Sequence, residues 1–443
     1  MTFRSNTIKF DCLKFISILF YFIPVSLGYS HVISDILLSI IASSFILFII
    51  INKKWDLLKN KFTYLFFLFW TIIVINSFFA EIFIVAFRLS FFYIRYLFFS
   101  LAVYFLIKNN KNFLSNSFYS VSFAYIVVLL FSYFQLITGY NIILDNLFDL
   151  FDKGFKPYPQ RISGLFGKEL VLGGYLIRMF PLYLALYFIQ KKNLIINISF
   201  YSISILVIIM NFFAGERSSL FLLAIILTLA IFLIKDFLKL KKYLLIFISV
   251  AIILITGTEN EIKRRFFIQT FFMQIYDNNK LYFFSEQHEA HFKTAYNIFK
   301  DNMIFGSGAK MFSVKCHDAK YNKDIPIITY ADGNKLYLSC TTHPHNTYLQ
   351  ILAETGLVGF FFLILVLGYF FKNIFLLYKN RNINKLNTKY YNFSLILNIG
   401  FFSYLFPLMP TGNFFSNWLS VAYYLPVGDR KSTRLNSSHV KRS

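Results

Sequence analysis

The chain has 443 residues, of which 57% are hydrophobic, 21% aromatic and only 15% charged, with a mean hydropathy of +0.59. A typical soluble domain carries about 25% charged residues, so this composition excludes an ordinary soluble enzyme and a disordered protein. The net charge of +23 would suit a nucleic-acid binder, but the basic residues stand in short clusters between apolar runs instead of along one amphipathic face. The composition predicts an all-α, polytopic helical membrane protein.

Apolar runs of roughly 20 residues, the length that crosses a bilayer, recur along the chain. We expect about twelve transmembrane helices, near residues 10–28, 32–52, 62–80, 83–107, 115–137, 170–190, 194–214, 218–234, 243–257, 347–371, 392–409 and 413–427. These apolar runs predict nine helices in residues 1–257, with an outer loop near 141–169. A large loop at 258–345 and three further helices in 346–428 complete the predicted organisation.

Clusters of basic residues predict the orientation of these helices. They follow the second, fourth, sixth, eighth and tenth apolar runs, and comprise Lys53, Lys54, Lys59, Lys61, Lys108, Lys111, Lys191, Lys192, Lys235, Lys239, Lys241, Lys242, Lys372, Lys379, Arg381, Lys385 and Lys389. Basic loops stay in the cytoplasm, so we expect a cytoplasmic N-terminus. The two long connections, 141–169 and 258–345, then lie on the outer side.

The last residues, 429–443, differ in character from the rest. The stretch from Asp429 to His439 looks like the in-frame translation of a sequencing-library adapter, so we set this tail aside as a processing scar. The helix at 413–427 is then expected to be truncated.

The large outer loop contains Cys316 and Cys340. An oxidising outer compartment would allow these two residues to form a disulfide. Two free thiols are the alternative, because the sequence does not give their separation.

A histidine motif lies where this loop enters the tenth helix. His343 and His345 flank a proline, and Asn346 follows directly. Metal ligation needs three or four ligands, and the H-P-H spacing does not put both rings on one helical face, so we expect no metal here. A general base and a solvated surface residue are the remaining interpretations of His345. Glu354 lies within the helix, where an ionisable group is costly and usually functional, and we expect it either to orient His345 or to bind an acceptor hydroxyl.

Two arginines stand at the outer starts of predicted helices. Arg217 begins the eighth helix, where a cation opposes the helix dipole and requires an anionic partner. That partner is either Glu216 or a phosphate, which a helix N-terminus also favours. Arg161 precedes the sixth helix and its Gly173-Gly174 pair, although a surface arginine alone is a weak signal.

Further arginines lie inside predicted helices. Arg88 and Arg95 are seven residues apart and therefore share a helix face. An arginine in hydrocarbon needs a partner or a water-filled cavity. For Arg95 a buried acid and a ligand are equally suitable partners, and Arg178 in the sixth helix is a similar case.

Together, three outward helix N-termini, two arginines and a histidine are predicted to meet at the outer membrane surface. An arginine fork matches phosphate oxygens bidentately, so this combination suits a pyrophosphate whose developing charge must be stabilised as it leaves. The chain has no Asp-x-Asp pair to hold a metal for that purpose.

The order of these motifs resembles the O-antigen ligase and O-antigen polymerase family over roughly residues 155–427. The resemblance rests on His343-x-His345-Asn346-x-x-Leu349, Glu354-x-Gly356-x-x-Gly359, Gly215-x-Arg217-Ser218, Arg161-x-Ser163-Gly164 and Pro407-x-x-Pro410-x-Gly412-x-Phe414-Phe415. It implies a metal-independent, inverting glycosyltransferase without a cofactor, in the bacterial inner membrane.

The resemblance also implies substrates and roles. The donor would be a glycan on undecaprenyl pyrophosphate, and the acceptor either lipid A–core, for a ligase, or a second lipid-linked glycan, for a polymerase, both at the periplasmic face. His345 would be the base and Glu354 would assist it or bind the acceptor hydroxyl. Arg161 and Arg217 would hold the pyrophosphate, with secondary parts for His343, Asn346 and Arg95. No nucleic acid is expected as a partner, and the alternative function is a transporter or flippase of a lipid-linked saccharide.

Overall fold

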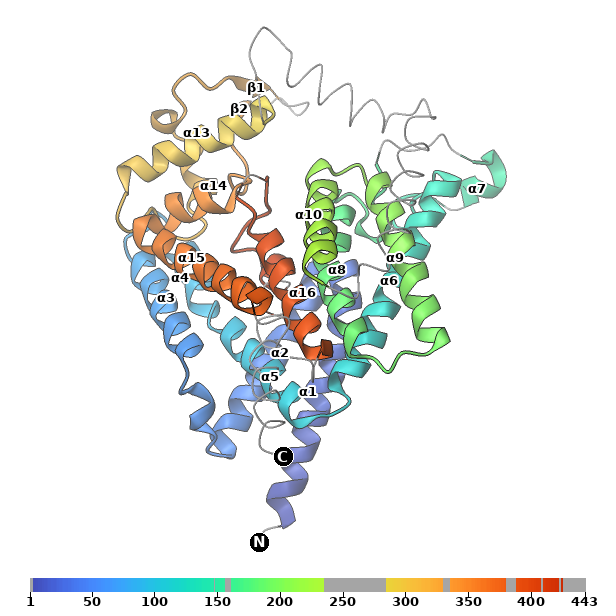
Figure 1. The fold of residues 1–443 in the computed structure, drawn as a ribbon. Coiled ribbons are helices and arrows are strands. Elements are labelled where there is room, and N and C mark those ends of the chain that lie inside the picture. Colours follow the sequence, from blue (N-terminus) through green and yellow to red (C-terminus); the bar gives the residue numbers. More distant parts are fainter. Residues whose placement is uncertain are drawn as a thin grey trace.

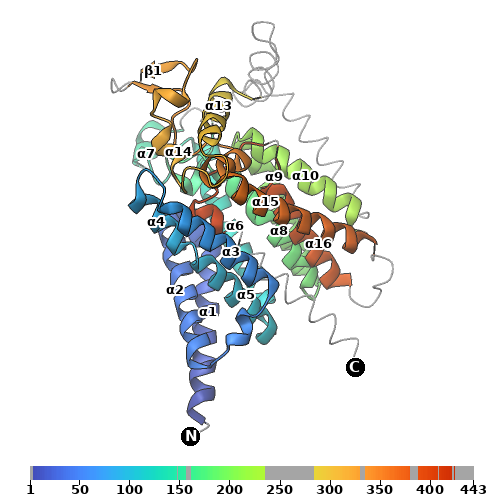
Figure 2. The same cartoon turned by 90° about the vertical axis from the view of Figure 1, so that its left-hand side faces the viewer.

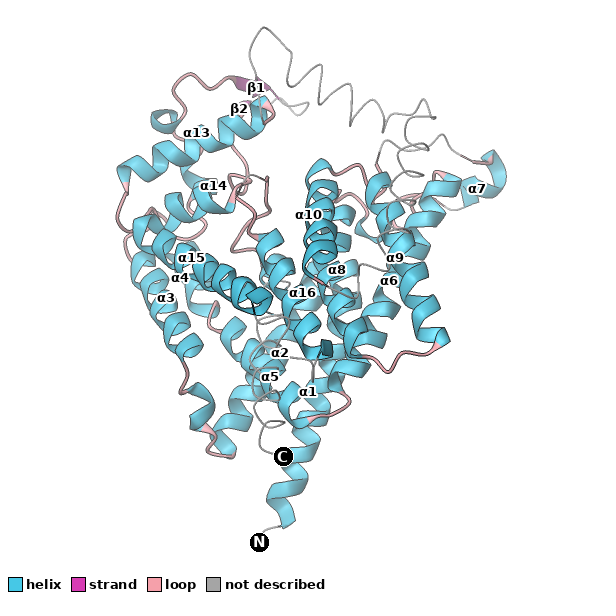
Figure 3. Ribbon diagram, in the orientation of Figure 1, coloured by secondary structure: helices cyan, strands magenta, loops and turns pink. Residues whose placement is uncertain are grey.

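The computed structural model describes residues 3–146, 148–155, 161–234, 284–329, 335–379, 388–407, 409–421 and 424, with side chains from residue 12 onward. In this part of the chain the fold is a bundle of helices, and two short strands lie beside α13 (Figure 3). The N-terminus lies at one end of the bundle, and α13, α14 and the strands lie at the other (Figure 1).

The described elements follow one another in a simple order. The helices are α1 (Phe3–Tyr29), α2 (His31–Ile51), α3 (Lys61–Ser77), α4 (Phe83–Phe92), α5 (Arg95–Asn109), α6 (Phe113–Thr138), α7 (Phe148–Lys153), α8 (Leu172–Ile189), α9 (Leu194–Phe213), α10 (Arg217–Leu233), α13 (Glu286–Asp301), α14 (Phe312–Lys315), α15 (Thr347–Lys379) and α16 (Thr388–Tyr404). Short 3-10 turns occur at Trp55–Leu58, Gly164–Phe166 and Ala319–Tyr321. Strands β1 (Ile327–Thr329) and β2 (Lys335–Tyr337) pair antiparallel, with Ile328 opposite Leu336.

Seven stretches of helix are long and apolar enough to cross a membrane. They are Cys12–Tyr29, His31–Ile51, Phe83–Asn109, Phe113–Thr138, Leu172–Ile189, Leu194–Phe213 and Thr347–Lys379. These match the first, second, fourth, fifth, sixth, seventh and tenth predicted spans, and they agree with a helical membrane protein. The count of twelve is not confirmed, because α3 and α10 are shorter apolar helices. The predicted span at 243–257, the end of the span at 413–427 and the tail at 429–443 lie outside the described residues.

The fourth predicted span is not one continuous helix. α4 ends at Phe92 and α5 begins at Arg95. Between them the hydrogen bonds tighten to 3-10 spacing, since Tyr93 N donates to Ser90 O at 3.3 Å and Tyr96 N donates to Tyr93 O at 3.2 Å. Such a tight turn inside a helix often marks a functional region or strain, and here Tyr93, Arg95 and Tyr96 all line the cavity described below.

Helix α8 forms the centre of the bundle and packs against α6, α9, α10 and α16. Nearly all its side chains are buried, which is typical of a helix that is apolar all round. The outer helices instead expose large apolar side chains, including Leu130 of α6 and Ile195 of α9. Figure 2 shows α1 and α2 side by side and α15 beside α16, in agreement with their contacts. The apolar outer surface is the one a bilayer would cover.

The described connections with predicted cytoplasmic lysine clusters lie at one end of the bundle. The α2–α3, α5–α6 and α8–α9 connections are at the end nearer the N-terminus, opposite α13 and α14 (Figure 1). The three connections thus share one end of the bundle, as the positions of the lysine clusters predict. Which end faces the cytoplasm stays a prediction.

Helix α15 bends sharply at Gly356, which has φ 64° and ψ −164°. The loop from Met303 to Gly308 docks into this bend. Leu357 N donates to Met303 O at 2.8 Å, Ser307 N to Ala353 O at 2.9 Å and Gly308 N to Glu354 O at 3.0 Å. The bend therefore joins the segment that follows α13 to α15 through backbone hydrogen bonds.

Replacing Gly356 with alanine is expected to destabilise this junction. A Cβ at this position would lie 2.3 Å from Ile304 O, and a positive φ costs an L-residue roughly 1–2 kcal/mol even without a clash. We expect the free energy of unfolding to fall by about 3 kcal/mol or more, measured as a lower Tm in detergent. Gly368→Ala in the same helix is the matched control, since its Cβ would meet nothing within 4 Å. An equal fall in both variants would contradict the prediction.

The outer elements form a small second core on the first turns of α15. Ala295 and Ile298 of α13 pack with Phe312, Tyr321 and Ala353. The structure joins Cys316 to Cys340 in a disulfide, with 5.1 Å between their Cα atoms. This crosslink fixes the segment that leads into the histidine motif.

Candidate active site

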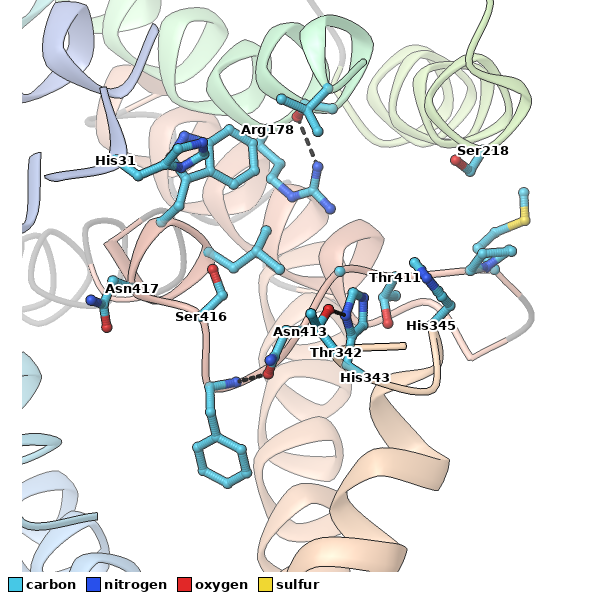
Figure 4. A pocket seen from close by; sticks show the side chains of 18 of the residues that line it. His31, Arg178, Ser218, Thr342, His343, His345, Thr411, Asn413, Ser416 and Asn417 are labelled. Atoms are coloured by element: carbon cyan, nitrogen blue, oxygen red, sulfur yellow. Dashed lines mark hydrogen bonds between the residues drawn. The ribbon is translucent and has the colours of Figure 1, made fainter. Parts of the chain in front are cut away.

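A cavity of about 1710 Å³ lies between α8, α10, the start of α13 and residues 409–419. Figure 4 shows the side chains of some of the residues that line it, among them Arg178 of α8, Ser218 of α10 and Asn413. Its described charged and histidine lining residues are Arg88, Arg95, Arg161, Arg178, Arg217, Lys310, Asp35, Glu216, His31, His288, His343 and His345. Six cations against two acids make the cavity positive, which favours an anionic ligand.

One of the two acids belongs to an internal network. Asp35 lies 2.8 Å from Arg95 Nη2 in an ion pair. Arg95 also donates to Ser39 Oγ at 3.2 Å and to Asn417 Oδ1 at 3.0 Å. Of the two interpretations of Arg95, these contacts favour the pair with a buried acid.

The second acid, Glu216, connects Arg161 to the start of α8. Its carboxylate accepts hydrogen bonds from Gly173 N at 2.8 Å and Gly174 N at 3.0 Å, and lies 3.7 Å from Arg161 Nη2. Glu216 therefore occupies the N-terminus of α8, where an anion is favoured. A side-chain carboxylate thus already fills this helix end.

Arg161 is held on several sides. Its Nη2 donates to Leu170 O at 2.8 Å and its Nε donates to Ala214 O at 3.3 Å. Arg161 thus ties the start of α8 to the end of α9 while lining the cavity. Arg217 lines the same cavity from the first turn of α10 and lies near His288, whose pKa its charge helps to lower.

Four histidines form a cluster beside these arginines. The ring of His345 lies 4.1 Å from that of His343, 5.2 Å from that of His291 and 5.5 Å from that of His288, measured between centroids. His288 and His291 come from α13, three residues apart and therefore on neighbouring positions of one face. The histidine motif and the outer helix thus build one site together.

All four rings have lowered pKa values. Burial is the main cause, and it lowers the pKa of His345 to about 3 and the pKa values of His288 and His343 to about 4. Burial also lowers the pKa of His291, whose Nδ1 lies 2.8 Å from Ser339 O. A carbonyl accepts only, so the proton of His291 is on Nδ1 and its Nε2 carries a lone pair. The cluster is neutral at pH 7.

The backbone at His345 is itself unusual, with φ 52° in a residue that is not glycine. Such a conformation is uncommon and tends to occur at functional sites, where the surroundings enforce it. His345 O accepts from Thr411 N at 2.8 Å, and Thr347 Oγ1 lies 2.8 Å from Thr411 Oγ1. These bonds join the histidine motif to the late Pro407–Phe415 segment, two parts of the chain that the sequence analysis singled out separately.

Asn346 has a structural position at the start of α15. Its Oδ1 accepts from Tyr348 N at 3.0 Å and Leu349 N at 3.1 Å, and its Nδ2 donates to Pro407 O at 3.4 Å. It therefore acts as the helix N-cap.

Glu354 does not orient His345 directly, contrary to the expectation from the sequence. Its buried carboxylate accepts from Gln350 Nε2 at 3.1 Å and from Phe312 N at 3.2 Å, and it is not among the described residues that line the cavity. Gln350 also donates to Asn413 Oδ1 at 2.7 Å. The carboxylate is thus connected to the cavity wall through Gln350.

One group of described residues has metal-ligand spacing. The ligand atoms of Cys316, His317 and Cys340 lie within 4.8 Å of one another. Both sulfurs are in the disulfide, and a thiolate is the form of cysteine that binds a metal. The disulfide therefore leaves His317 as the one remaining ligand of this group of three.

Several cavity residues were missed in the sequence. His288, His291 and Lys310 were not identified, although the i, i+3 spacing of the two histidines on an amphipathic stretch was a signal. Their approach to His345 depends on the docking of α13 on α15. By contrast, the sequence predicted that four residues lie on the same side of the membrane, and all four line one cavity: Arg161, Arg217, His343 and His345.

Comparison with known proteins gives a relative and a family match. An uncharacterized protein of Haemophilus influenzae (strain ATCC 51907 / DSM 11121 / KW20 / Rd) is 26% identical over 250 residues, which are 55% of this chain and 58% of that protein. The chain thus aligns with less than two thirds of that relative's length. Residues 202–364 match the O-antigen ligase family, a segment that contains Arg217, the four clustered histidines and Glu354. Through this segment, the chain is similar to the O-antigen ligase family.

Proposed function

We propose that this protein transfers a glycan from an undecaprenyl-pyrophosphate carrier to an acceptor hydroxyl at the periplasmic face of the bacterial inner membrane, without a metal or cofactor. The observation that carries the proposal is a positive cavity that Arg161, Arg217 and the neutral His345 line together, His345 with a positive φ. The match of residues 202–364 to the O-antigen ligase family supports a ligase- or polymerase-like function.

In the proposed reaction the acceptor hydroxyl oxygen attacks the anomeric carbon of the donor sugar. A new glycosidic C–O bond forms as the bond from that carbon to the pyrophosphate oxygen breaks, and the configuration inverts. His345 takes the hydroxyl proton. Arg217 and Arg161 stabilise the negative charge that develops on the leaving pyrophosphate, as preorganised donors do for developing anions.

The low pKa of His345 fits a base that the donor activates. A pyrophosphate bound beside the cluster places negative charge near the ring, and a nearby anion favours the protonated form of an imidazole and raises its pKa. His345 would then be a stronger base in the complex than in the free protein. Glu354 is proposed to act as a positioning residue, because its carboxylate orients Gln350, which in turn orients Asn413 in the cavity wall. His343 is the second choice for the base.

The pH dependence of activity is expected to reflect these shifts. In the free protein His345 stays neutral down to about pH 3 and His343 to about pH 4, whereas an ordinary histidine becomes protonated near pH 6.5. We therefore expect kcat/KM for the donor, which reports the free protein, to stay level from pH 7.5 to about 5. A half-loss of kcat/KM at pH 6.5 would contradict the shifts.

Stability must be followed over the same pH range. Below pH 6.5 the unfolded chain binds protons on these histidines and the native protein does not, so the free energy of unfolding falls as the pH drops from 6.5 towards 4. Tm measured at each pH separates this loss from a change in catalysis. His345→Gln should have a Tm that varies less with pH than that of the unchanged protein.

A reconstituted transfer reaction tests the function. The protein is placed in proteoliposomes with lipid-linked glycan repeats and lipid A–core, and products are separated on a gel. Glycan on lipid A–core would indicate a ligase, and a ladder growing on the carrier would indicate a polymerase. Folded protein that transfers to neither would overturn the proposal for these acceptors.

A further inference from the structure

Arg178 projects from α8 into the cavity. Among the described residues no carboxylate lies within ion-pair distance of its guanidinium, although its charge acts on the nearby Glu216 and favours the ionised carboxylate. Arg178 Nη1 donates to Gly174 O of its own helix at 2.9 Å, and its Nε is buried without a hydrogen-bond partner. The nearby acid, Glu216, is bound by Arg161 and two backbone amides. A cation inside an apolar helix is costly and marks a functional site by default.

The direction of this guanidinium is fixed by Trp418. The Arg178 Cζ atom lies 5.5 Å from the centre of the indole ring, within the range of a cation–π contact. Trp418 is held in turn, since its Nε1 donates to Leu27 O at 3.0 Å and His31 lies edge-on to it at 5.9 Å. The indole is only 8% exposed, so it serves to position the arginine and leaves little face for a ligand.

The wall opposite Arg178 presents hydrogen-bond donors of fixed orientation. Asn413 Oδ1 accepts from Gln350 Nε2 at 2.7 Å and from Phe415 N at 2.9 Å. Asn417 Oδ1 accepts from Arg95 Nη2 at 3.0 Å and from Tyr96 OH at 3.1 Å. Each amide oxygen is thus occupied. The NH₂ group of each asparagine makes no hydrogen bond among the described residues.

Ser416 adds a hydroxyl between the two asparagines, and all three residues line the cavity. In Figure 4 the histidine motif lies between Ser218 on one side and Asn417 and His31 on the other. Ser416 and Asn417 are thus on the other side of the motif from Ser218, and Arg178 points toward them from α8. A cation with fixed amide donors matches the oxygens of an anion.

We propose that Arg178, Asn413, Ser416 and Asn417 form a subsite for an acidic group, a carboxylate or a phosphate, on the acceptor saccharide. This inference rests on the proposed function and specifies its acceptor class. The donor pyrophosphate binds on the Arg217 side of the histidine motif, and the acidic acceptor sugar binds on the Arg178 side. Arg178 then determines which acceptor is chosen and does not act on the reacting bond.

Binding without catalysis tests the subsite. The full chain in nanodiscs is titrated with hexyl β-D-glucuronide, hexyl β-D-glucoside and hexyl β-D-glucoside 6-phosphate by calorimetry. We expect one or both acidic probes to bind about 10- to 100-fold more tightly than the glucoside, the range typical of a charge-assisted contact. The two acidic probes decide between carboxylate and phosphate.

Three variants make the test specific. Arg178→Gln should abolish the preference for the acidic probe, and Arg178→Lys should restore part of it. Arg88→Gln, which removes an exposed cation of the same cavity, should keep the preference. Equal binding of all three probes, no binding of any, or a preserved preference in Arg178→Gln would overturn the proposal.

A transfer assay separates acceptor from donor. With an acidic acceptor, Arg178→Gln should raise the acceptor KM about 10-fold or more and leave the donor KM unchanged. A raised donor KM would instead place the acidic group on the donor and overturn the acceptor assignment. If no glycan is transferred at all, the proposed function fails, while the binding preference of Arg178 is still measured by the titration.

Discussion

Replacing His345 with alanine is expected to lower the rate of glycan transfer by about 100- to 10,000-fold, the usual contribution of a positioned general base. His345 is the histidine whose ring centroid lies within 5.5 Å of three other imidazoles, and its backbone is bound to the Pro407–Phe415 segment through Thr411. The measurement is the initial rate of product formation with saturating donor and acceptor. The loss should be in kcat, because the base acts on the reacting hydroxyl.

Two controls make this result interpretable. His317→Ala removes an exposed histidine of the outer loop and should leave the rate unchanged. His343→Ala tests the neighbouring ring and should have a smaller effect than His345→Ala. If His345→Ala keeps full activity, or if His343→Ala is the more damaging change, the role assigned to His345 is wrong.

Arg217→Ala is expected to lower kcat/KM for the donor by about 100- to 1,000-fold, the range for loss of one group that stabilises a developing anion. Arg217 lines the cavity at the first turn of α10, where it adds positive charge close to the histidine cluster. The variant should fold normally, with a Tm within about 2 °C of the unchanged protein, as is usual for a substitution outside the core.

Arg161→Ala should differ from Arg217→Ala in stability. It too should lose activity, but it also leaves the half-buried Glu216 carboxylate without its cation. We expect the free energy of unfolding to fall by about 3 kcal/mol. Glu216→Gln in the Arg161→Ala background should restore part of that loss, because it removes the uncompensated charge. Equal stability of the two arginine variants would contradict this distinction.

Much of the fold could be predicted because a bilayer imposes strict rules on sequence. A helix that crosses hydrocarbon must be apolar for roughly 20 residues, and this requirement makes α1, α2, α6, α8 and α9 visible as runs of hydrophobic residues. Hydrophobicity does not report bends, however. The break between α4 and α5 and the bend of α15 at Gly356 depend on backbone contacts with segments elsewhere in the structure.

The partners of charged residues were harder to predict. Arg95 and Asp35 are 60 positions apart, and Arg161 and Glu216 are 55 apart, so no local spacing indicates these ion pairs. Glu354 was singled out correctly as a buried acid, but its partners come from α14 and from Gln350 one turn earlier. A side chain's chemistry is read from its type, whereas its partner is set by which helices pack together.

By itself, the sequence determined that this is a helical membrane protein with the motifs of the O-antigen ligase family, and that His345, Arg161 and Arg217 share one side of it. These properties follow from hydrophobicity, from residue type and from the alternation of successive connections between the two sides of the membrane, all of which can be read along the chain. Only the tertiary structure decided that His288 and His291 lie beside His345, that Glu216 occupies the start of α8, and that Arg178 faces the cavity without a described ion pair. Those contacts join segments separated by tens to hundreds of residues, and only the packing of α8, α13, α15 and α16 brings them together.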